Sequence, residues 1–341
     1  MRSNNYFQNI YIEIVGFCNA KCPYCTTGAK NAPCGGLMKH ETFSDVIQML
    51  LKNKLADKNS LIHLYNWGEP FLHPTLKNLV EIINVHGLKY ALSTNSSRLP
   101  VQIDREFSKN LKQVIYSMPG FSQDSYDKIH GFNFDRIIKN IANFTNCVRH
   151  HNEAVEFLIS YHVYRFNYNE MKACEKFADN FNIEFSPRYA LLNDWWQLEK
   201  YLAENKNSEK IERDIFISNI RETMSKIPNQ YKCPQYKGLT IDEVGNILTC
   251  CVLPRNHPDY SCGNLLTDNI EFVLNSRPGK KVCKYCINTG LAGYLNDLKC
   301  PREYKKSAKQ LFLPLHYDRY RKFLANLCPE ILLSFFKKFK G

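Results

Sequence analysis

Short apolar segments alternate with helical patterns along the first 192 residues of the chain. Between the first two segments, the apolar residues Phe43, Val46, Ile47, Leu50 and Leu51 recur at helical spacing. This alternation predicts βα units around a parallel sheet. Six such units predict an α/β fold, a partial (β/α)6 TIM-like barrel, with its active site at the carboxyl ends of the strands. The expected strands span residues 11–17, 61–67, 89–95, 113–118, 154–164 and 183–192.

The βα pattern ends near residue 193, and three segments of different composition follow it. A polar, charged helical stretch comes first, a cysteine-rich stretch second and a basic stretch last. We therefore expect four parts in the chain. They are a barrel over residues 1–193, a helical linker over 194–232, a small cysteine-rich extension over 233–300 and a basic amphipathic tail over 301–341.

The positive charge of the chain is concentrated near its end. The net charge is +12, and residues 299–341 hold 11 Lys and Arg against 3 Asp and Glu. The rest of the chain is nearly neutral, which argues against a nucleic-acid partner. The tail "ILLSFFKKFKG" (331–341) has two interpretations. We expect it to pack its apolar residues on the barrel, and contact with an anionic membrane surface is the alternative.

The first residues contain no apolar signal segment, and no uncharged apolar run reaches membrane-spanning length. We therefore expect a cytoplasmic protein. Disulfides are rare in that reducing compartment, so the 14 cysteines are expected to be metal ligands or redox groups.

Three of these cysteines, Cys18, Cys22 and Cys25, lie in one loop with the spacing C-x3-C-x2-C. A structural zinc site takes four protein ligands, commonly as two separated pairs. Three thiolates from a single loop suit an iron–sulfur cluster that keeps one iron open for a small molecule. The loop follows the first expected strand directly, which places it at the expected active-site end of the barrel.

With Tyr24 directly before the last cysteine, this loop resembles the cluster motif of radical S-adenosylmethionine (SAM) enzymes. The resemblance implies a [4Fe–4S] cluster on the three cysteines, with the amino and carboxylate groups of SAM on the open iron. It further implies that the reduced cluster cleaves SAM to a 5′-deoxyadenosyl radical, which abstracts hydrogen from a substrate. An external electron donor of the flavodoxin or ferredoxin type would supply the electron.

Two further strand ends resemble motifs of the same family. "NWGEP" (66–70) resembles its Gly-Gly-Glu-Pro segment, with Trp67 replacing the first glycine. "STN" (93–95) resembles its Thr-Asn-Gly segment, with Ser96 replacing the glycine. The alternative for the later strand ends is an ordinary turn. The resemblance implies that SAM is bound by Tyr24, Gly68, Glu69, Pro70, Ser93, Asn95 and Ser117.

In the cysteine-rich extension, Cys233 is followed by Gly245-x4-Cys250 and then, at a distance, by Cys283-x2-Cys286. This arrangement resembles the SPASM and twitch domains, which carry auxiliary clusters in that family. The resemblance implies one auxiliary [4Fe–4S] cluster. A structural zinc on the same residues is the alternative, and Cys251, Cys262 and Cys300 are alternative ligands. The expected ligands are Cys233, Cys250, Cys283 and Cys286.

A fully ligated second cluster has no iron free for a substrate, so its expected task is electron transfer. This favours an oxidoreductase. The resemblance to twitch-bearing enzymes implies that it dehydrogenates a small polar substrate such as a sugar or aminocyclitol. Because the first strand is expected to begin near residue 11, we expect no peptide-recognition domain before it. A peptide- or protein-modifying enzyme is the main alternative, and a zinc-stabilised binding protein and an iron–sulfur electron carrier are two others. No general base is identified, and the candidate substrate contacts are Tyr161, His162, Arg188 and Tyr189.

Overall fold

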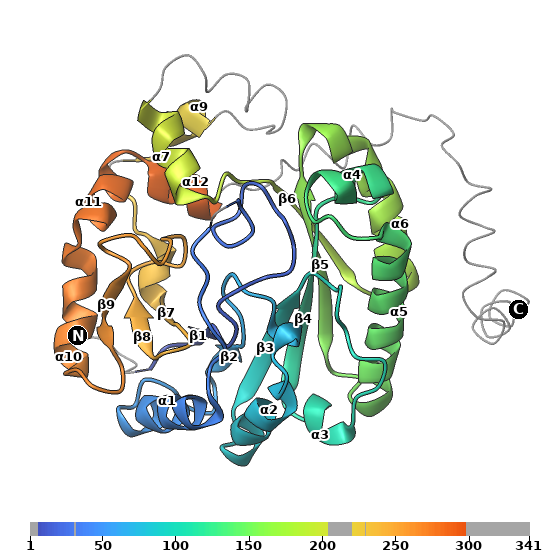
Figure 1. Ribbon diagram of the computed structural model, residues 1–341, viewed down its shortest axis with the longest axis horizontal. Helices are drawn as coiled ribbons and strands as arrows, with labels where there is room; N and C mark the ends of the chain where they lie inside the picture. The colour runs from blue at the N-terminus through green and yellow to red at the C-terminus, as the bar shows by residue number, and fades with distance from the viewer. Residues whose placement is uncertain (1–5, 31, 204–219, 229, 298–341) are drawn as a thin grey trace, which may run out of the picture. The chain divides into compact units, whose positions relative to one another are not determined.

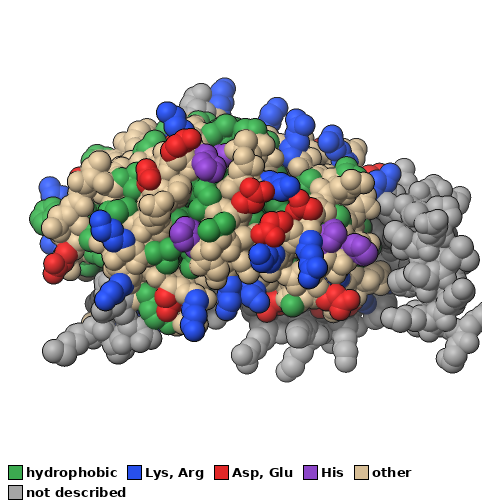
Figure 2. Space-filling view, turned by 90° about the horizontal axis from the view of Figure 1, so that it is seen from below, with side chains coloured by type: hydrophobic (Ala, Val, Ile, Leu, Met, Phe, Trp, Pro, Cys, Tyr) green, Lys and Arg blue, Asp and Glu red, His purple; other side chains and the backbone are tan. Residues whose placement is uncertain are grey.

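The computed structural model describes residues 6–297, with residues 31, 204–219 and 229 excepted. Cys300 and the basic tail therefore lie outside the described residues. None of the described helices is long and apolar enough to cross a membrane. On the face shown in Figure 2, basic and acidic side chains are interspersed over the surface.

One nine-stranded sheet, in the order β6-β5-β4-β3-β2-β1-β7-β8-β9, organises the described residues (Figure 1). The neighbouring pairs from β6 through β1 to β7 are parallel, and β7-β8 and β8-β9 are antiparallel. The strands are β1 (Asn9–Ile12), β2 (Leu61–His63), β3 (Lys89–Thr94), β4 (Leu111–Met118), β5 (Glu156–Val163), β6 (Glu184–Tyr189), β7 (Gly238–Ile241), β8 (Asn246–Leu248) and β9 (Ser261–Asn264).

Helices connect the parallel strands, and α1, α2, α5 and α6 lie along the outer side of the curved sheet (Figure 1). The α-helices are α1 (His40–Lys52), α2 (Leu76–Val85), α3 (Arg105–Ser108), α4 (Gln123–Lys128), α5 (Phe134–His151), α6 (Met171–Asn180), α7 (Trp195–Ala203), α9 (Ile220–Ser225), α10 (Ile270–Ser276), α11 (Lys281–Asn288) and α12 (Leu291–Asp297). The 3-10 helices are η1 (Pro70–Leu72), η2 (Arg165–Glu170), η3 (Pro234–Lys237) and η4 (Arg277–Gly279).

Helix α5 shows how the sequence specifies these elements. Asn133 caps its first turn by accepting a hydrogen bond from the Arg136 backbone N–H at 2.9 Å. Ile137, Ile141 and Phe144 recur at helical spacing and are buried. The helix therefore begins at its cap and covers the sheet with one apolar stripe.

The predicted α/β partial barrel is confirmed, because six parallel strands follow one another with helices between them. The first expected strand is shorter than predicted: β1 ends at Ile12, and Val15 pairs in an isolated antiparallel bridge with Leu37. The second also ends early, at His63. After each of these two strands the chain leaves the sheet and forms a loop at the carboxyl ends of the barrel strands.

The extension joins the same sheet, which the sequence did not predict. Strand β7 pairs in parallel with β1, with Ile10 opposite Leu239 and Ile12 opposite Ile241. The sheet thus continues from the barrel into β8 and β9 without interruption. As a result, the cysteine-rich segment begins beside the strand that carries the three-cysteine loop. The expected boundaries at residues 193 and 233 stay a prediction.

Candidate active site

A cavity of about 410 Å³ lies where the carboxyl ends of the barrel strands meet the loop that follows β1. That loop, dark blue in Figure 1, runs between the barrel strands and the extension. The cavity brings together nearly all the residues expected to hold the first cluster and SAM. Its lining includes Cys18, Cys22, Tyr24, Cys25, Gly68, Glu69, Ser93, Asn95 and Ser117. Pro70 is not in the lining; it is buried at the start of η1.

The thiols of the three-cysteine loop accept hydrogen bonds from nearby N–H groups. Cys18 Sγ accepts from the Ala20 backbone N–H and from Asn95 Nδ2, both at 3.4 Å. Cys25 Sγ accepts from the Thr27 backbone N–H at 3.5 Å. Burial raises the pKa of Cys18 to about 11 and also raises those of Cys22 and Cys25. Donors around buried sulfurs fit a set of thiolates whose charge a metal would balance.

Gly68 lies where the second strand's turn crosses the end of the first. A Cβ built at this position would overlap the carbonyl oxygen of Val15. Only glycine lets the two backbone segments approach so closely. The glycine of "NWGEP" is therefore required by packing, whatever further contact it makes to a cofactor.

Glu69 connects the second and third strand ends. Its carboxylate is buried and accepts from Phe71 N at 3.2 Å, Thr94 Oγ1 at 2.8 Å and Asn95 N at 2.7 Å. Burial raises the pKa of this carboxyl to about 7. Asn95, fixed in this way, extends its amide to Cys18 Sγ and donates to Asn19 Oδ1 at 2.9 Å. Hydrogen bonds thus link the "NWGEP" turn, the "STN" strand end and the three-cysteine loop, which are separate in the sequence.

Ser96, which replaces the glycine of the third-strand motif, has a φ of 65°. Its buried hydroxyl has no hydrogen-bond partner among the described residues. We expect Ser96→Gly to raise the free energy of unfolding by about 1 kcal/mol, because the left-handed backbone costs an L residue about this much. Urea denaturation measures the effect. Ser97→Gly is the matched control and should lower stability, because Ser97 Oγ accepts from Asn19 at 2.8 Å. A less stable Ser96→Gly protein would contradict this explanation.

The far wall of the cavity comes from β4, β5 and β6, through Ser117, Ser160, His162 and Arg188. Among the described lining residues, Arg188 is the only Lys or Arg. Burial, with Arg188 nearby, lowers the pKa of His162 to about 4, so its imidazole is neutral near pH 7. Tyr189 also lines the cavity.

Tyr161 does not line the cavity, unlike the other three residues considered as substrate contacts. Its side chain is fully buried, and its hydroxyl donates to the Asn167 carbonyl oxygen at 2.9 Å. Successive residues of a strand face opposite sides of the sheet, so its neighbour His162 points into the cavity and Tyr161 away from it.

A second, smaller cavity of about 30 Å³ gathers four cysteines of the extension. Cys233 precedes η3, Cys250 follows β8, and the other two lie one turn apart on α11. Cys251 and Cys262 are not in its lining, and Cys262 Sγ lies 3.3 Å from Thr249 Oγ1. The cysteines that line the cavity are Cys233, Cys250, Cys283 and Cys286.

A buried arginine that the sequence did not reveal lies beside this cavity. Arg277 donates to the carbonyl oxygens of Thr249 at 3.0 Å, Gly238 at 2.7 Å and Gln235 at 2.9 Å. It is 4% exposed and forms no ion pair within the described part of the chain. A buried cation needs a counter-charge. Burial raises the pKa of Cys233 to about 11, and the contact with Cys251 together with burial raises that of Cys250; the nearby charge of Arg277 offsets only part of each rise. The buried arginine and the four cysteines beside it therefore fit an anionic group that is bound through thiolates.

Within the described ranges, no three His, Cys, Asp or Glu side chains are arranged to hold a single metal ion. The cysteines instead line the walls of two cavities. In a [4Fe–4S] cluster each iron takes its own thiolate, so the ligands need not converge on one point.

Residues 12–168 match the family model described as the radical SAM superfamily. This stretch contains the three-cysteine loop, the "NWGEP" turn and the ends of strands β3 to β5. The chain therefore carries a radical SAM domain, and that domain indicates an enzyme. No curated protein matches the sequence.

Three solved structures are similar to this chain, and the first two of them, with TM-scores above 0.5, illustrate the shared fold. SuiB of Streptococcus suis, bound to precursor peptide SuiA, has a TM-score of 0.54 at 16% identity over 85% of this chain and 71% of that chain. anSMEcpe, with bound AdoMet and the Cp18Cys peptide, has a TM-score of 0.52 at 15% identity over 94% and 98% of the two chains. BtrN, in complex with AdoMet and 2-DOIA, has a TM-score of 0.45 at 15% identity over 87% and 92%.

Proposed function

We propose that this chain is a radical SAM oxidoreductase with two [4Fe–4S] clusters. The observation that carries the proposal is the convergence of the three-cysteine loop and two SAM-motif strand ends on one cavity. A second cavity lined by four cysteines supports an auxiliary cluster. The proposed ligands are Cys18, Cys22 and Cys25 for the first cluster and Cys233, Cys250, Cys283 and Cys286 for the second.

The chemistry supplied by the first site is the one-electron cleavage of SAM to a radical that abstracts hydrogen. The chain's own residues would bind and orient the cluster and SAM. Asn95 donates to Cys18 Sγ, and the Trp67–Gly68 turn forms one wall of the cavity. Ser93 and Ser117 present hydroxyls from the ends of β3 and β4 and are the proposed contacts to SAM.

The proposed reaction is a two-electron oxidation of the substrate. The substrate loses a hydrogen atom from carbon, then a proton and one electron, so that an alcohol would become a carbonyl compound. Bound SAM would supply the hydrogen acceptor: one electron from a flavodoxin- or ferredoxin-type donor would break its C5′–S bond, methionine would leave, and the 5′-deoxyadenosyl group would take the hydrogen atom and become 5′-deoxyadenosine. The four-cysteine site is the proposed acceptor of the second electron.

A small polar substrate agrees with the lining of the cavity, where hydroxyls, imidazoles and one guanidinium face the interior. Arg188 would pair with a carboxylate or phosphate, because guanidinium groups bind such anions with two parallel hydrogen bonds. Peptide modification is the second candidate. It is favoured by the peptides bound to SuiB and anSMEcpe, whose folds this chain shares.

Anaerobic reconstitution of the full chain with iron and sulfide tests the proposal. Two clusters predict about eight irons per chain, and dithionite should then drive cleavage of SAM to 5′-deoxyadenosine. Replacing Cys283 and Cys286 by alanine should lower the iron content to about four while SAM cleavage persists at saturating SAM. Cys34→Ala, at an exposed cysteine outside both cavities, is the matched control. Zinc in the protein with no SAM cleavage would overturn the proposal.

A further inference from the structure

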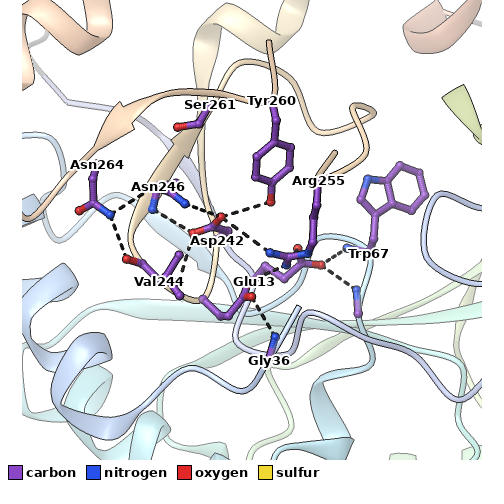
Figure 3. Close-up of polar contacts among 12 residues, drawn as sticks. Glu13, Gly36, Trp67, Asp242, Val244, Asn246, Arg255, Tyr260, Ser261 and Asn264 are labelled. Carbon is purple, nitrogen blue, oxygen red and sulfur yellow. Dashed lines mark hydrogen bonds and ion pairs between the residues drawn. The ribbon is translucent and has the colours of Figure 1, made fainter. Parts of the chain in front are cut away.

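The backbone of the Trp67–Gly68 turn is held by a buried glutamate. The N–H groups of Trp67 and Gly68 both donate to Glu13 Oε1, at 2.8 Å and 2.9 Å (Figure 3). Glu13 follows β1 directly and its side chain is almost fully buried. One carboxylate oxygen thus holds the backbone of both residues of this turn, which lines the cavity proposed to bind SAM.

The other oxygen of Glu13 pairs with an arginine of the extension. Arg255 Nη2 lies 3.1 Å from Glu13 Oε2 and 2.6 Å from Glu243 Oε2. Glu243 Oε1 in turn accepts from the Gly36 backbone N–H at 2.9 Å. Asp242 Oδ2 lies 3.8 Å from Arg255 Nη1 (Figure 3). Because three buried carboxylates surround one guanidinium, loss of Arg255 would leave them mutually repelling and without a counter-charge.

The barrel leaves room for this guanidinium through two glycines. A Cβ at Gly16 would lie 2.6 Å from Arg255 Nη2, and one at Gly35 would overlap Glu243 and the guanidinium. The Gly35 N–H also donates to the Gly16 carbonyl oxygen at 2.7 Å. The arginine of the extension therefore fits into a space that the loop after β1 provides.

A second connection joins the same turn to the extension. The indole N–H of Trp67 donates to the carbonyl oxygen of Cys251. Cys251 adjoins Cys250, which lines the four-cysteine cavity, and Arg255 follows four residues later. The segment of residues 250–255 thus carries both connections to the SAM cavity and one cysteine of the second site. Trp67, where the family motif has glycine, supplies one of these connections.

We propose that the 250–255 segment positions the Trp67–Gly68 turn, so that SAM affinity depends on the extension. Arg255 acts through Glu13, and the Cys251 carbonyl acts through Trp67. Occupation of the four-cysteine site fixes Cys250 and hence this segment, which couples the two sites. The inference rests on the proposed function, because it takes the first cavity as the SAM site. Such coupling is reciprocal: bound SAM stabilises the segment as much as the segment favours SAM.

SAM affinity of the reconstituted full chain, measured by equilibrium binding, tests the positioning. The change that SAM causes in the electron paramagnetic resonance signal of the reduced first cluster gives a second readout. Arg255→Met should weaken SAM binding about tenfold or more, within the usual range of site-to-site coupling. Arg255→Lys keeps the charge and should restore part of the affinity. Trp67→Phe keeps an aromatic ring but removes the indole N–H, and it should weaken binding while the Arg255 ion pairs remain.

Lys77→Met is the matched control, because Lys77 forms an exposed ion pair with Asp104 at 2.6 Å. It should bind SAM as the wild type does. Wild-type affinity in Arg255→Met protein that retains its iron would overturn the inference. If Arg255→Met does not fold, Arg255→Lys and Trp67→Phe decide by the same readouts, and unchanged affinity in both overturns it. A wild-type protein that fails to bind SAM would instead overturn the proposed function.

Discussion

Replacing Cys18, Cys22 and Cys25 together by alanine is expected to abolish SAM cleavage. The three thiols line one cavity and are the proposed ligands of the cluster that reduces SAM. With all three removed, neither the cluster nor the open iron can form, so 5′-deoxyadenosine should fall to background. Iron content should fall from about eight to about four per chain, because the four-cysteine site is untouched.

The triple variant distinguishes the two sites because the four-cysteine site should still bind its cluster. Its remaining cluster should show the absorption and resonance signals of a fully ligated cluster that does not respond to SAM. The Cys34→Ala and Cys147→Ala variants control for the loss of thiols as such, since neither residue lines either cavity. SAM cleavage at the wild-type rate in the triple variant would place the reactive cluster elsewhere.

Gly68→Ala is expected to have the second largest effect. The added methyl group would overlap the Val15 carbonyl oxygen and lie 3.0 Å from that of Phe17. Both are backbone atoms that side-chain rotation cannot relieve, so the turn must move away from the first strand. We expect the free energy of unfolding to fall by about 3 kcal/mol, and SAM affinity to be lost because the moved turn forms the cavity wall.

Gly36→Ala is the matched control for that substitution. A Cβ at Gly36 would meet no atom within 4 Å, and its N–H would still donate to Glu243. Chemical denaturation of both variants measures the difference. Equal stability of the two would show that the turn yields at little cost, and the packing explanation for Gly68 would be wrong.

The cysteine loop was predictable because its chemistry is local. Cys18, Cys22 and Cys25 fall within eight residues, so their spacing alone indicates a shared ligand. The convergence of the later strand ends on this loop was predictable for another reason, since the carboxyl ends of parallel strands meet at one edge of the sheet. The structure confirms the barrel and places Asn95 next to Cys18.

The partners that hold the site together had no such signal. Glu13 and Arg255 lie 242 positions apart, and nothing in either neighbourhood indicates the other. Arg277 looked like one of many basic residues, yet it binds three backbone carbonyls beside the four cysteines. Tyr161 and His162 are adjacent in the sequence, but only the register of the strand decides which of them faces the cavity.

The sequence by itself determined the α/β class and the three-cysteine loop, because these depend on periodicity and short spacing. Only the tertiary structure decided that the extension continues the barrel's sheet through β7, and that its 250–255 segment contacts the Trp67–Gly68 turn. The physical reason is that these contacts depend on strand order and on buried charge neutralisation. Both are properties of residues brought together by folding, and no local pattern records them.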